Sequence, residues 1–147
     1  MWLDPKGNFK DFSEIVEKID NVCEVFVGSD SQLLSDSWMF ATVVCLYWPG
    51  KGGTYFFTRG KKEKSSYATL GDRLMSEVYS SVIVADQIRQ LRPDLKINVH
   101  ADIGSCPTSR SNKFAKLAEN YIKGMGFSSA IKPDAWAAAA VADKFTR

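Results

Sequence analysis

The sequence has few of the residues that staple small proteins or bind soft metals. It contains three cysteines and one histidine among 147 residues. Cys23, Cys45 and Cys106 form no C-x-x-C pair, and His100 does not lie at zinc-finger spacing from any of them. This excludes a disulfide framework and a zinc finger. A Cys–His hydrolase would have to use His100 with Cys106, and stays open as an alternative.

Charge of one sign and long hydrophobic runs are also scarce. Lysine and arginine total 19 and aspartate and glutamate 17, for a net charge of +2. This excludes a strongly basic nucleic-acid coat but not a local basic face. No apolar run approaches the roughly 20 residues of a transmembrane helix, and the first residues lack the apolar stretch of a secretory signal. We therefore expect a soluble, cytoplasmic protein with no membrane partner.

No repeat, low-complexity tract or Pro/Gly-rich linker interrupts the chain. With 45% hydrophobic and 24% charged residues, the composition is that of a globular protein. A chain of this length matches one domain of ordinary size. We predict a single domain over residues 1–147, with residues 1–21 as an N-terminal helical extension.

The hydrophobic pattern changes near residue 70 from a strand-like period to a helical one. Before this point we expect a short helix and three strands followed by a basic loop, and after it helices alternating with strands. The expected order is helix, strand, strand, strand, helix, strand, helix, strand, helix, over residues 11–19, 23–30, 38–48, 52–59, 70–91, 96–101, 108–123, 127–132 and 133–145. This order predicts an α/β fold with a mixed five-stranded sheet, whose first three strands form an antiparallel meander, flanked by helices.

One glutamate falls on the apolar side of its helix. At about 100° per residue, Glu77 lies within the stripe that contains Leu74, Val78 and Val84. Burying a carboxylate costs on the order of several kcal/mol unless the group is paired or binds a metal. We favour a functional role for Glu77, and the alternative is a salt bridge to Arg73 at the edge of the stripe.

Three aspartates occupy the ends of predicted elements. Asp30 closes the strand at 23–30, Asp102 follows the strand at 96–101, and Asp134 lies in the first turn of the last helix. Singly, each is explained by a turn or by the helix dipole. Together with Glu77 they would converge at one sheet edge and repel by on the order of 4 kcal/mol per close pair. Oxygen ligands alone suit Mg²⁺ or Mn²⁺, and two such ions can hydrolyse a phosphodiester.

The element order and the acids together resemble the ribonuclease H-like superfamily. The motifs VGSDSQ, VHADIG and KPDAWAAAAVADKFT, with the Glu77 helix, are similar to the YkuK-type predicted ribonuclease H-related nucleases of bacteria and phages, over about residues 22–147. This resemblance implies a hydrolase that uses two Mg²⁺ or Mn²⁺ ions on RNA, DNA or a hybrid, with water as the nucleophile. It implies that the metal-binding and catalytic residues are Asp30, Glu77, Asp102 and Asp134. The alternative is a non-catalytic nucleic-acid-binding or assembly module that keeps the fold.

The last helix contains a second candidate acid. Asp134 and Asp143 are nine residues apart, which in an ideal helix is about 900° of rotation and places them on opposite faces. Asp134 shares its face with apolar residues, so we favour it as the ligand and expect Asp143 to hold a basic partner, although Asp143 stays open as the fourth acid. We expect His100 to be supportive, orienting Asp102 or lining the substrate groove.

Basic residues form two groups that are suited to phosphate contacts. One group lies in the loop after the third strand and the other on the outer side of the helix at 108–123: Arg59, Lys61, Lys62 and Lys64, and Arg110, Lys113 and Lys116. The alternative for each is ordinary solvated surface. Tyr55, Phe56 and Phe57 are expected in the strand core and Trp136 in packing, not in base stacking.

Overall fold

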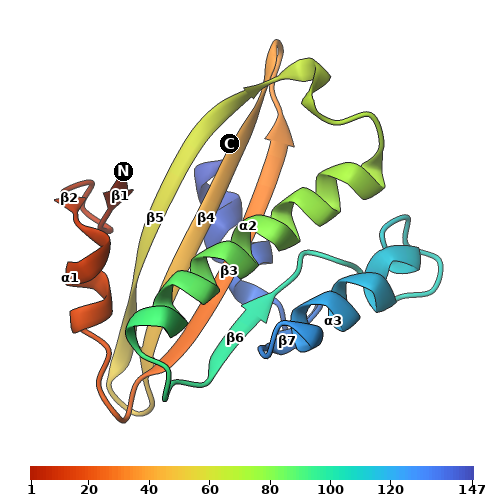
Figure 1. Cartoon of the computed structure of the whole chain (residues 1–147). Helices are drawn as coiled ribbons and strands as arrows, with labels where there is room; N and C mark the ends of the chain where they lie inside the picture. The colour runs from red at the N-terminus through yellow and green to blue at the C-terminus, as the bar shows by residue number, and fades with distance from the viewer.

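A mixed sheet runs through the computed structural model, which describes residues 1–147 (Figure 1). The strands are β1 (Trp2–Leu3), β2 (Phe9–Lys10), β3 (Glu24–Leu33), β4 (Ser37–Trp48), β5 (Gly52–Glu63), β6 (Ile97–His100) and β7 (Ser128–Ala130). Their order is β2-β1-β5-β4-β3-β6-β7. β6 is parallel to β3 and to β7, and all other neighbours are antiparallel. The predicted α/β fold with a mixed, helix-flanked sheet is confirmed.

The predicted number of five strands is wrong, because the sheet has seven. The two additional strands, β1 and β2, come from residues 1–21, which we expected to be a helical extension. Leu3 of β1 pairs with Phe57 of β5, so this region extends the sheet. Each of these strands has two residues, too few to show an alternating pattern in the sequence.

The third long strand also continues further than predicted. β5 runs to Glu63, and therefore Arg59, Lys61 and Lys62 lie on a strand instead of a loop. Backbone pairing explains the extension, since Lys62 and Glu63 of β5 face the beginning of β4 in an unbroken antiparallel ladder. A run of charged residues has low strand propensity, and here the tertiary pairing outweighs that preference.

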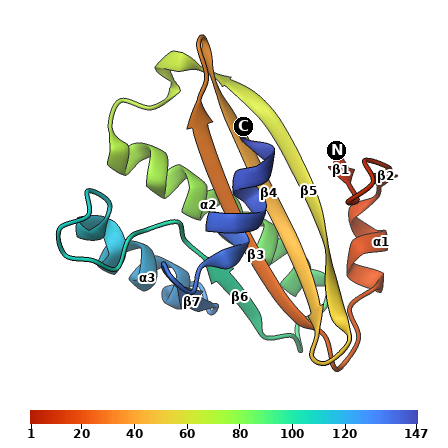
Figure 2. The same cartoon turned by 180° about the vertical axis from the view of Figure 1, so that it is seen from behind.

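Helices cover both faces of the sheet (Figures 1 and 2). One face carries α1 (Phe12–Glu17), α2 (Leu70–Leu91), the short η2 (Asn112–Phe114) and α3 (Ala115–Gly124). The opposite face carries the last segment, which is a π-helical turn, η3 (Ala137–Val141), followed by a 3-10 turn, η4 (Ala142–Phe145). None of these helices is long and apolar enough to cross a membrane.

The helix boundaries follow the expected signals only in part. α2 begins after Thr69, whose hydroxyl accepts a hydrogen bond from the Asp72 amide at 3.0 Å, and it spans the predicted residues 70–91. α3 starts at Ala115 instead of residue 108, because a chain of turns occupies the residues before it. The last helix begins after Pro133 and Asp134, which lie in a turn closed by the Asp134 amide and the Ile131 carbonyl at 2.9 Å.

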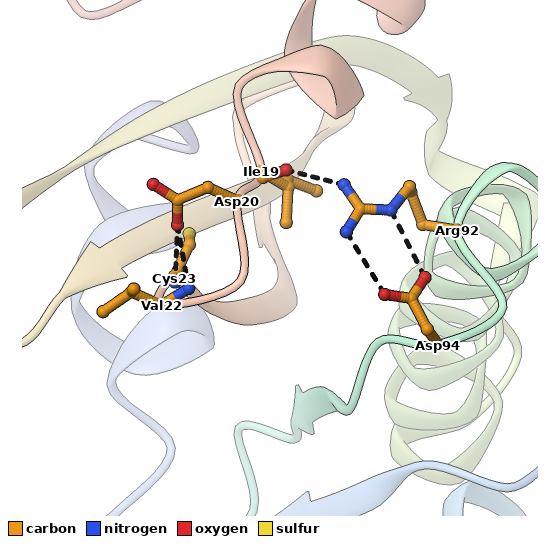
Figure 3. Close-up of polar contacts among 6 residues, drawn as sticks. All are labelled: Ile19, Asp20, Val22, Cys23, Arg92 and Asp94. Atoms are coloured by element: carbon orange, nitrogen blue, oxygen red, sulfur yellow. Dashed lines mark hydrogen bonds and ion pairs between the residues drawn. The ribbon is translucent and has the colours of Figure 1, made fainter.

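The end of α2 is tied to the connection between α1 and β3 (Figure 3). Arg92 donates to the Ile19 carbonyl at 2.6 Å and to both carboxylate oxygens of Asp94 at 3.3 Å. Asp20 accepts from the Val22 and Cys23 amides at 3.0 and 2.9 Å. These contacts hold the first residues of β3 beside the C-terminal end of α2, leaving the other end of β3 for polar side chains.

The last segment packs close to the sheet because the facing side chains on both are small. A Cβ atom built on Gly28 of β3 would lie 2.5 Å from the Ala138 amide nitrogen. Ala137 and Ala142 pack with Val43 and Phe57 in a core cluster separate from the larger one beneath α2. The small alanine side chains therefore allow the last segment to pack directly on the backbone of β3.

Candidate functional site

The sheet has an open edge halfway along β3. The last residue of β6, His100, pairs with Gly28, whereas β3 continues to Leu33 with only β4 beside it. Asp30 is two residues past this point, and Asp102 is two residues past the end of β6. Since no strand fills this edge, side chains from the two faces of the sheet can approach one another there.

Asp30 is buried at the open edge, with 7% of its surface exposed. The Thr146 hydroxyl donates a hydrogen bond to its Oδ2 at 3.2 Å. Burial raises the pKa of Asp30 to about 7, and the nearby carboxylates of Asp102 and, more weakly, Asp143 raise it as well. Asp30 therefore lies in an environment that favours its neutral form.

Glu77 approaches the same edge from α2. Only 4% of it is exposed, which confirms the predicted position in the apolar stripe. The Ser31 hydroxyl donates to Glu77 Oε2 at 2.5 Å. Burial raises the pKa of Glu77 well above its usual value; the Ser31 bond opposes this shift, and the Asp30 charge adds to it. Arg73 also lowers the pKa, but it forms no ion pair with Glu77, so the alternative of a salt bridge is wrong.

Asp102 is held by a lysine that the sequence reasoning missed. Lys132 Nζ lies 2.7 Å from Asp102 Oδ1. The hydrogen bond to Asp102 raises the pKa of Lys132, and the charges of Asp102, Asp30 and Asp143 favour the charged ammonium further. One signal was available: Lys132 closes the predicted strand at 127–132, and parallel neighbouring strands bring their C-terminal ends to the same edge.

The two acids of the last segment lie in different surroundings. Asp134 is exposed and precedes the helix, so its predicted place in the first turn is wrong; its charge acts on His100. Asp143 is partly buried, forms an ion pair with Arg147 at 2.7 Å, and acts on Asp30. The ideal-helix rotation does not apply to this pair, because residues 134 and 135 are not helical and the next turn is a π-helix.

A comparison with models of protein families identifies the family of this chain. The model of a family described as Ribonuclease H-like matches residues 9–147. The chain belongs to the ribonuclease H-like family. Searches of curated proteins and of solved structures find no match. The matched range contains every acid discussed above, so the ribonuclease H-like assignment from the sequence is confirmed.

We define the acidic site of this ribonuclease H-like chain as Asp30, Glu77, Asp102 and Asp143. The four acids are electrostatic neighbours, since Asp30 is affected by Asp102 and Asp143, and Glu77 by Asp30 and Asp102. No three histidine, cysteine or carboxylate groups are close enough together to form a ready-made metal site. Each of the four acids instead has a protein partner: Thr146 for Asp30, Ser31 for Glu77, Lys132 for Asp102 and Arg147 for Asp143.

His100 supports the last segment instead of Asp102. Its Nδ1 accepts a hydrogen bond from the Ala137 amide at 3.1 Å, and its ring packs against Phe26 and Trp136. Burial lowers the pKa of His100 to about 4, and the Asp134 charge opposes the shift. His100 is therefore neutral at pH 7. It does not pair with the exposed Cys106, which contacts Thr108, so a Cys–His hydrolase is excluded.

The basic and aromatic residues that the sequence singled out lie in different surroundings. Phe56 and Phe57 are buried, as predicted, and Trp136 packs against Phe26 with ring centroids 4.7 Å apart. The side chain of Lys62 lies over the Phe40 ring at 4.5 Å. Arg110 lies in the turns before α3 instead of on a helix, and it lines a cavity with residues of α2 and β4.

Proposed function

We propose that this ribonuclease H-like protein is a metal-dependent nuclease that hydrolyses phosphodiester bonds of RNA, DNA or a hybrid. The observation that carries the proposal is the meeting of buried acids from β3, α2 and the residue stretch after β6 at an open sheet edge. Asp30 has a pKa raised to about 7 there, because burial and neighbouring carboxylates disfavour its charge. Divalent cations are the partners that such an all-oxygen set suits.

The residues that would hold two Mg²⁺ or Mn²⁺ ions are Asp30, Glu77, Asp102 and an acid of the last segment. Such ions supply an activated water and stabilise the leaving oxygen of the phosphodiester. The protein's own groups orient the ligands: the Thr146 hydroxyl bonds Asp30, and the Ser31 hydroxyl bonds Glu77. Lys132 holds Asp102 and therefore competes with a cation for that carboxylate.

The fourth acid is Asp134 by the sequence argument and Asp143 by the electrostatic one. Asp134 is exposed and its charge acts on His100, whereas the charge of Asp143 acts on Asp30 and Lys132. These effects support Asp143. Arg147, which pairs with Asp143, lies at an exposed position from which it can swing away.

The YkuK-type resemblance supports the same chemistry through four local motifs. VGSDSQ contains Asp30 and Ser31, VHADIG contains Asp102, and the last motif begins with Lys132 and includes both Asp134 and Asp143. Residues that bond the acids are thus part of the motifs themselves. This pattern supports a role for the motifs in building a site instead of only a fold.

Metal-dependent cleavage of single-stranded, double-stranded and hybrid substrates tests the proposal. We expect cleavage of at least one substrate with Mn²⁺ or Mg²⁺ and none with a chelator. Asp30→Asn should lower the rate at least about a hundredfold, because losing a ligand exceeds the roughly 10–100-fold effect of outer residues. Glu17→Gln, an exposed change on α1, is the matched control and should leave the rate unchanged.

One observation favours a second candidate, a nucleic-acid-binding module without catalysis. The Lys132–Asp102 ion pair suits an acidic site that is neutralised by the protein itself. In that case Mn²⁺ leaves the melting temperature unchanged while nucleic acid still binds. A clear rise in melting temperature with Mn²⁺, lost in Glu77→Gln, would exclude this candidate.

A further inference from the structure

A cavity of about 330 Å³ lies beside the N-terminal end of α2, one helical turn from the acidic site. It is lined by Trp38, Tyr67, Ala68, Thr69, Leu70, Arg73 and Arg110. Its volume is at the lower end of the range of small-molecule sites, roughly 300–1,000 Å³. The lining combines two aromatic rings with two guanidinium groups. Neither the capping of a helix nor the packing of an apolar core requires this combination of side chains.

The tryptophan ring is held in place by its neighbours. The Arg73 guanidinium lies 5.2 Å from the centroid of the Trp38 ring, and Tyr67 contacts that ring edge-on at 5.4 Å. The Trp38 Nε1–H donates to the Lys64 carbonyl at 3.2 Å. A ring fixed in this way lines the cavity and can contact a ligand at low cost in side-chain entropy.

The two arginines lack protein anions. Neither Arg73 nor Arg110 forms an ion pair with a carboxylate, and Arg73 Nε is buried without a hydrogen-bond acceptor. The turn that carries Arg110 is closed by two bonds of 2.9 Å, from the Gly104 amide to Ser111 Oγ and from Asn112 Nδ2 to the Gly104 carbonyl. Two guanidinium groups without ion-pair partners, one on α2 and one on this turn, match a phosphate, which accepts paired hydrogen bonds.

We infer that this cavity binds an unpaired nucleotide of a nucleic-acid strand, with the base against Trp38 and the phosphate between Arg73 and Arg110. Stacking on an aromatic ring requires an exposed base face, which a duplex does not offer and a single strand does. The inference rests on the proposed function, because it supplies the substrate class of the same site.

The position along the fold suits a neighbouring nucleotide of the cleaved strand. Arg73 precedes Glu77 by four residues, about 6 Å along the helix axis. Trp38 is three strand residues beyond Ala41, the partner of Asp30, which corresponds to about 10 Å. An unpaired strand is more extended than a duplex strand at about 3.4 Å per nucleotide, so this separation is at most about three nucleotides.

Fluorescence anisotropy in the presence of a chelator tests binding without cleavage. The probes are a labelled oligothymidylate of about 12 nucleotides and the same strand annealed to its complement. We expect the single strand to bind at least about tenfold more tightly than the duplex. Arg110→Ala should weaken single-strand binding about tenfold and lower the magnitude of the salt slope by about one. The matched control is Lys51→Ala, at the exposed turn at the other end of the β4–β5 hairpin, and it should change binding less than about twofold.

Tryptophan fluorescence reports directly on the base. The chain has four tryptophans, and we expect quenching by oligothymidylate that Trp38→Phe removes while circular dichroism stays unchanged. Equal weakening by Arg110→Ala and Lys51→Ala, or quenching that survives Trp38→Phe, would overturn the inference. Duplex binding as tight as single-strand binding would do the same.

The outcome also separates this inference from the proposed nuclease activity. If the variants lose binding but no substrate is cleaved with Mn²⁺, the nucleotide site stands and the nuclease proposal fails. If cleavage occurs and Arg110→Ala changes neither KM nor binding, the nuclease proposal stands and the nucleotide site fails.

Discussion

The two halves of β3 differ in their neighbours and in their chemistry. Residues 24–28 lie between β4 and β6, and they bury Val25 and Val27 with Gly28 beneath the last segment. Residues 29–33 have β4 alone beside them, and they bury Ser29, Asp30 and Ser31. A single strand thus builds the core where it is flanked on both sides and presents polar groups where one neighbour ends.

Polar burial in the second half is possible because the groups bond one another. Ser29 Oγ lies 2.8 Å from Thr42 Oγ1 and 2.7 Å from Ser81 Oγ, which links β3 to β4 and α2. The hydroxyl groups are satisfied, whereas the carboxylates of Asp30 and Glu77 stay costly to charge. The difference between the halves shows that one strand can combine an apolar core with a cluster of buried polar groups.

The largest expected effect comes from breaking the packed half. Gly28→Ala places a Cβ against the backbone of Ala137 and Ala138, which cannot shift as a flexible side chain can. We expect the free energy of unfolding to fall by about 3 kcal/mol, measured by urea denaturation. Gly60→Ala is the control, because a Cβ at Gly60 of β5 meets no atom within 4 Å. Similar losses for both variants would show that the close approach of the last segment is not what requires Gly28.

The second largest expected effect concerns Glu77, which contacts the polar half of β3. The folded-state pKa of Glu77 lies above its unfolded value, so its contribution to stability is present at low pH and is lost as the pH rises through the raised pKa. Glu77→Gln should therefore raise the free energy of unfolding of the metal-free protein near pH 8 and leave it unchanged near pH 4, as urea denaturation at the two pH values measures.

Mn²⁺ titration completes the Glu77 test. The ion should raise the melting temperature of the native protein, and Glu77→Gln should lose most of that rise. Glu17→Gln on α1 is the exposed control and should behave as the native protein does. A large loss of metal-free stability in Glu77→Gln would instead assign Glu77 a structural role.

The packed regions were more predictable from the sequence than the edges. α2 was correct to the residue because its apolar stripe repeats over 22 residues and Thr69 caps it. β1 and β2 are too short for a pattern, and the end of β5 depends on its pairing with β4. Pro133 is a frequent first residue of helices, but here it lies in a turn that directs the chain to the opposite face.

Asp30, Glu77 and Asp102 could be singled out from the sequence, but their partners could not. Glu77 was conspicuous because it interrupts an apolar stripe, and Asp30 and Asp102 because they were predicted at or just after strand ends. Asp102 does follow β6, whereas the predicted strand end at Asp30 is wrong, because β3 continues to Leu33 in its pairing with β4. Ser31, Thr146 and Lys132 are polar residues that any surface could carry, and only the tertiary fold brings them to the acids. The role of the acids in metal binding stays a prediction, which the Mn²⁺ titration tests.

The pH dependence of stability tests the state of His100, which lies at the boundary between the two halves of β3. Burial lowers its folded-state pKa from 6.5 to about 4, so its contribution to stability is present above pH 6.5 and is lost as the pH falls toward 4. Between about pH 7 and pH 5 we expect the protein to lose roughly 1–2 kcal/mol through this residue.

Urea denaturation of a His100→Asn variant over the same pH range isolates this contribution. The asparagine amide can still accept from the Ala137 N–H, but it does not titrate. The variant should be less stable at pH 7, because it loses ring contacts with Phe26 and Trp136, yet it should lack the acid-dependent loss. An unchanged pH dependence would mean that His100 is not neutral in the fold.

The smallest expected effect decides which acid of the last segment belongs to the polar half. Asp143 acts on Asp30 and Lys132, whereas Asp134 is exposed and acts on His100. We therefore expect Asp143→Asn to weaken Mn²⁺ binding about tenfold, which is about 1.4 kcal/mol, and Asp134→Asn to leave it unchanged. Isothermal titration with Mn²⁺ measures both. Without metal, Asp143→Asn should lose only the exposed ion pair to Arg147, which contributes little to stability. The opposite result, with binding lost in Asp134→Asn, would make Asp134 the fourth acid of the site. It would also require the chain after Lys132 to turn toward Asp30.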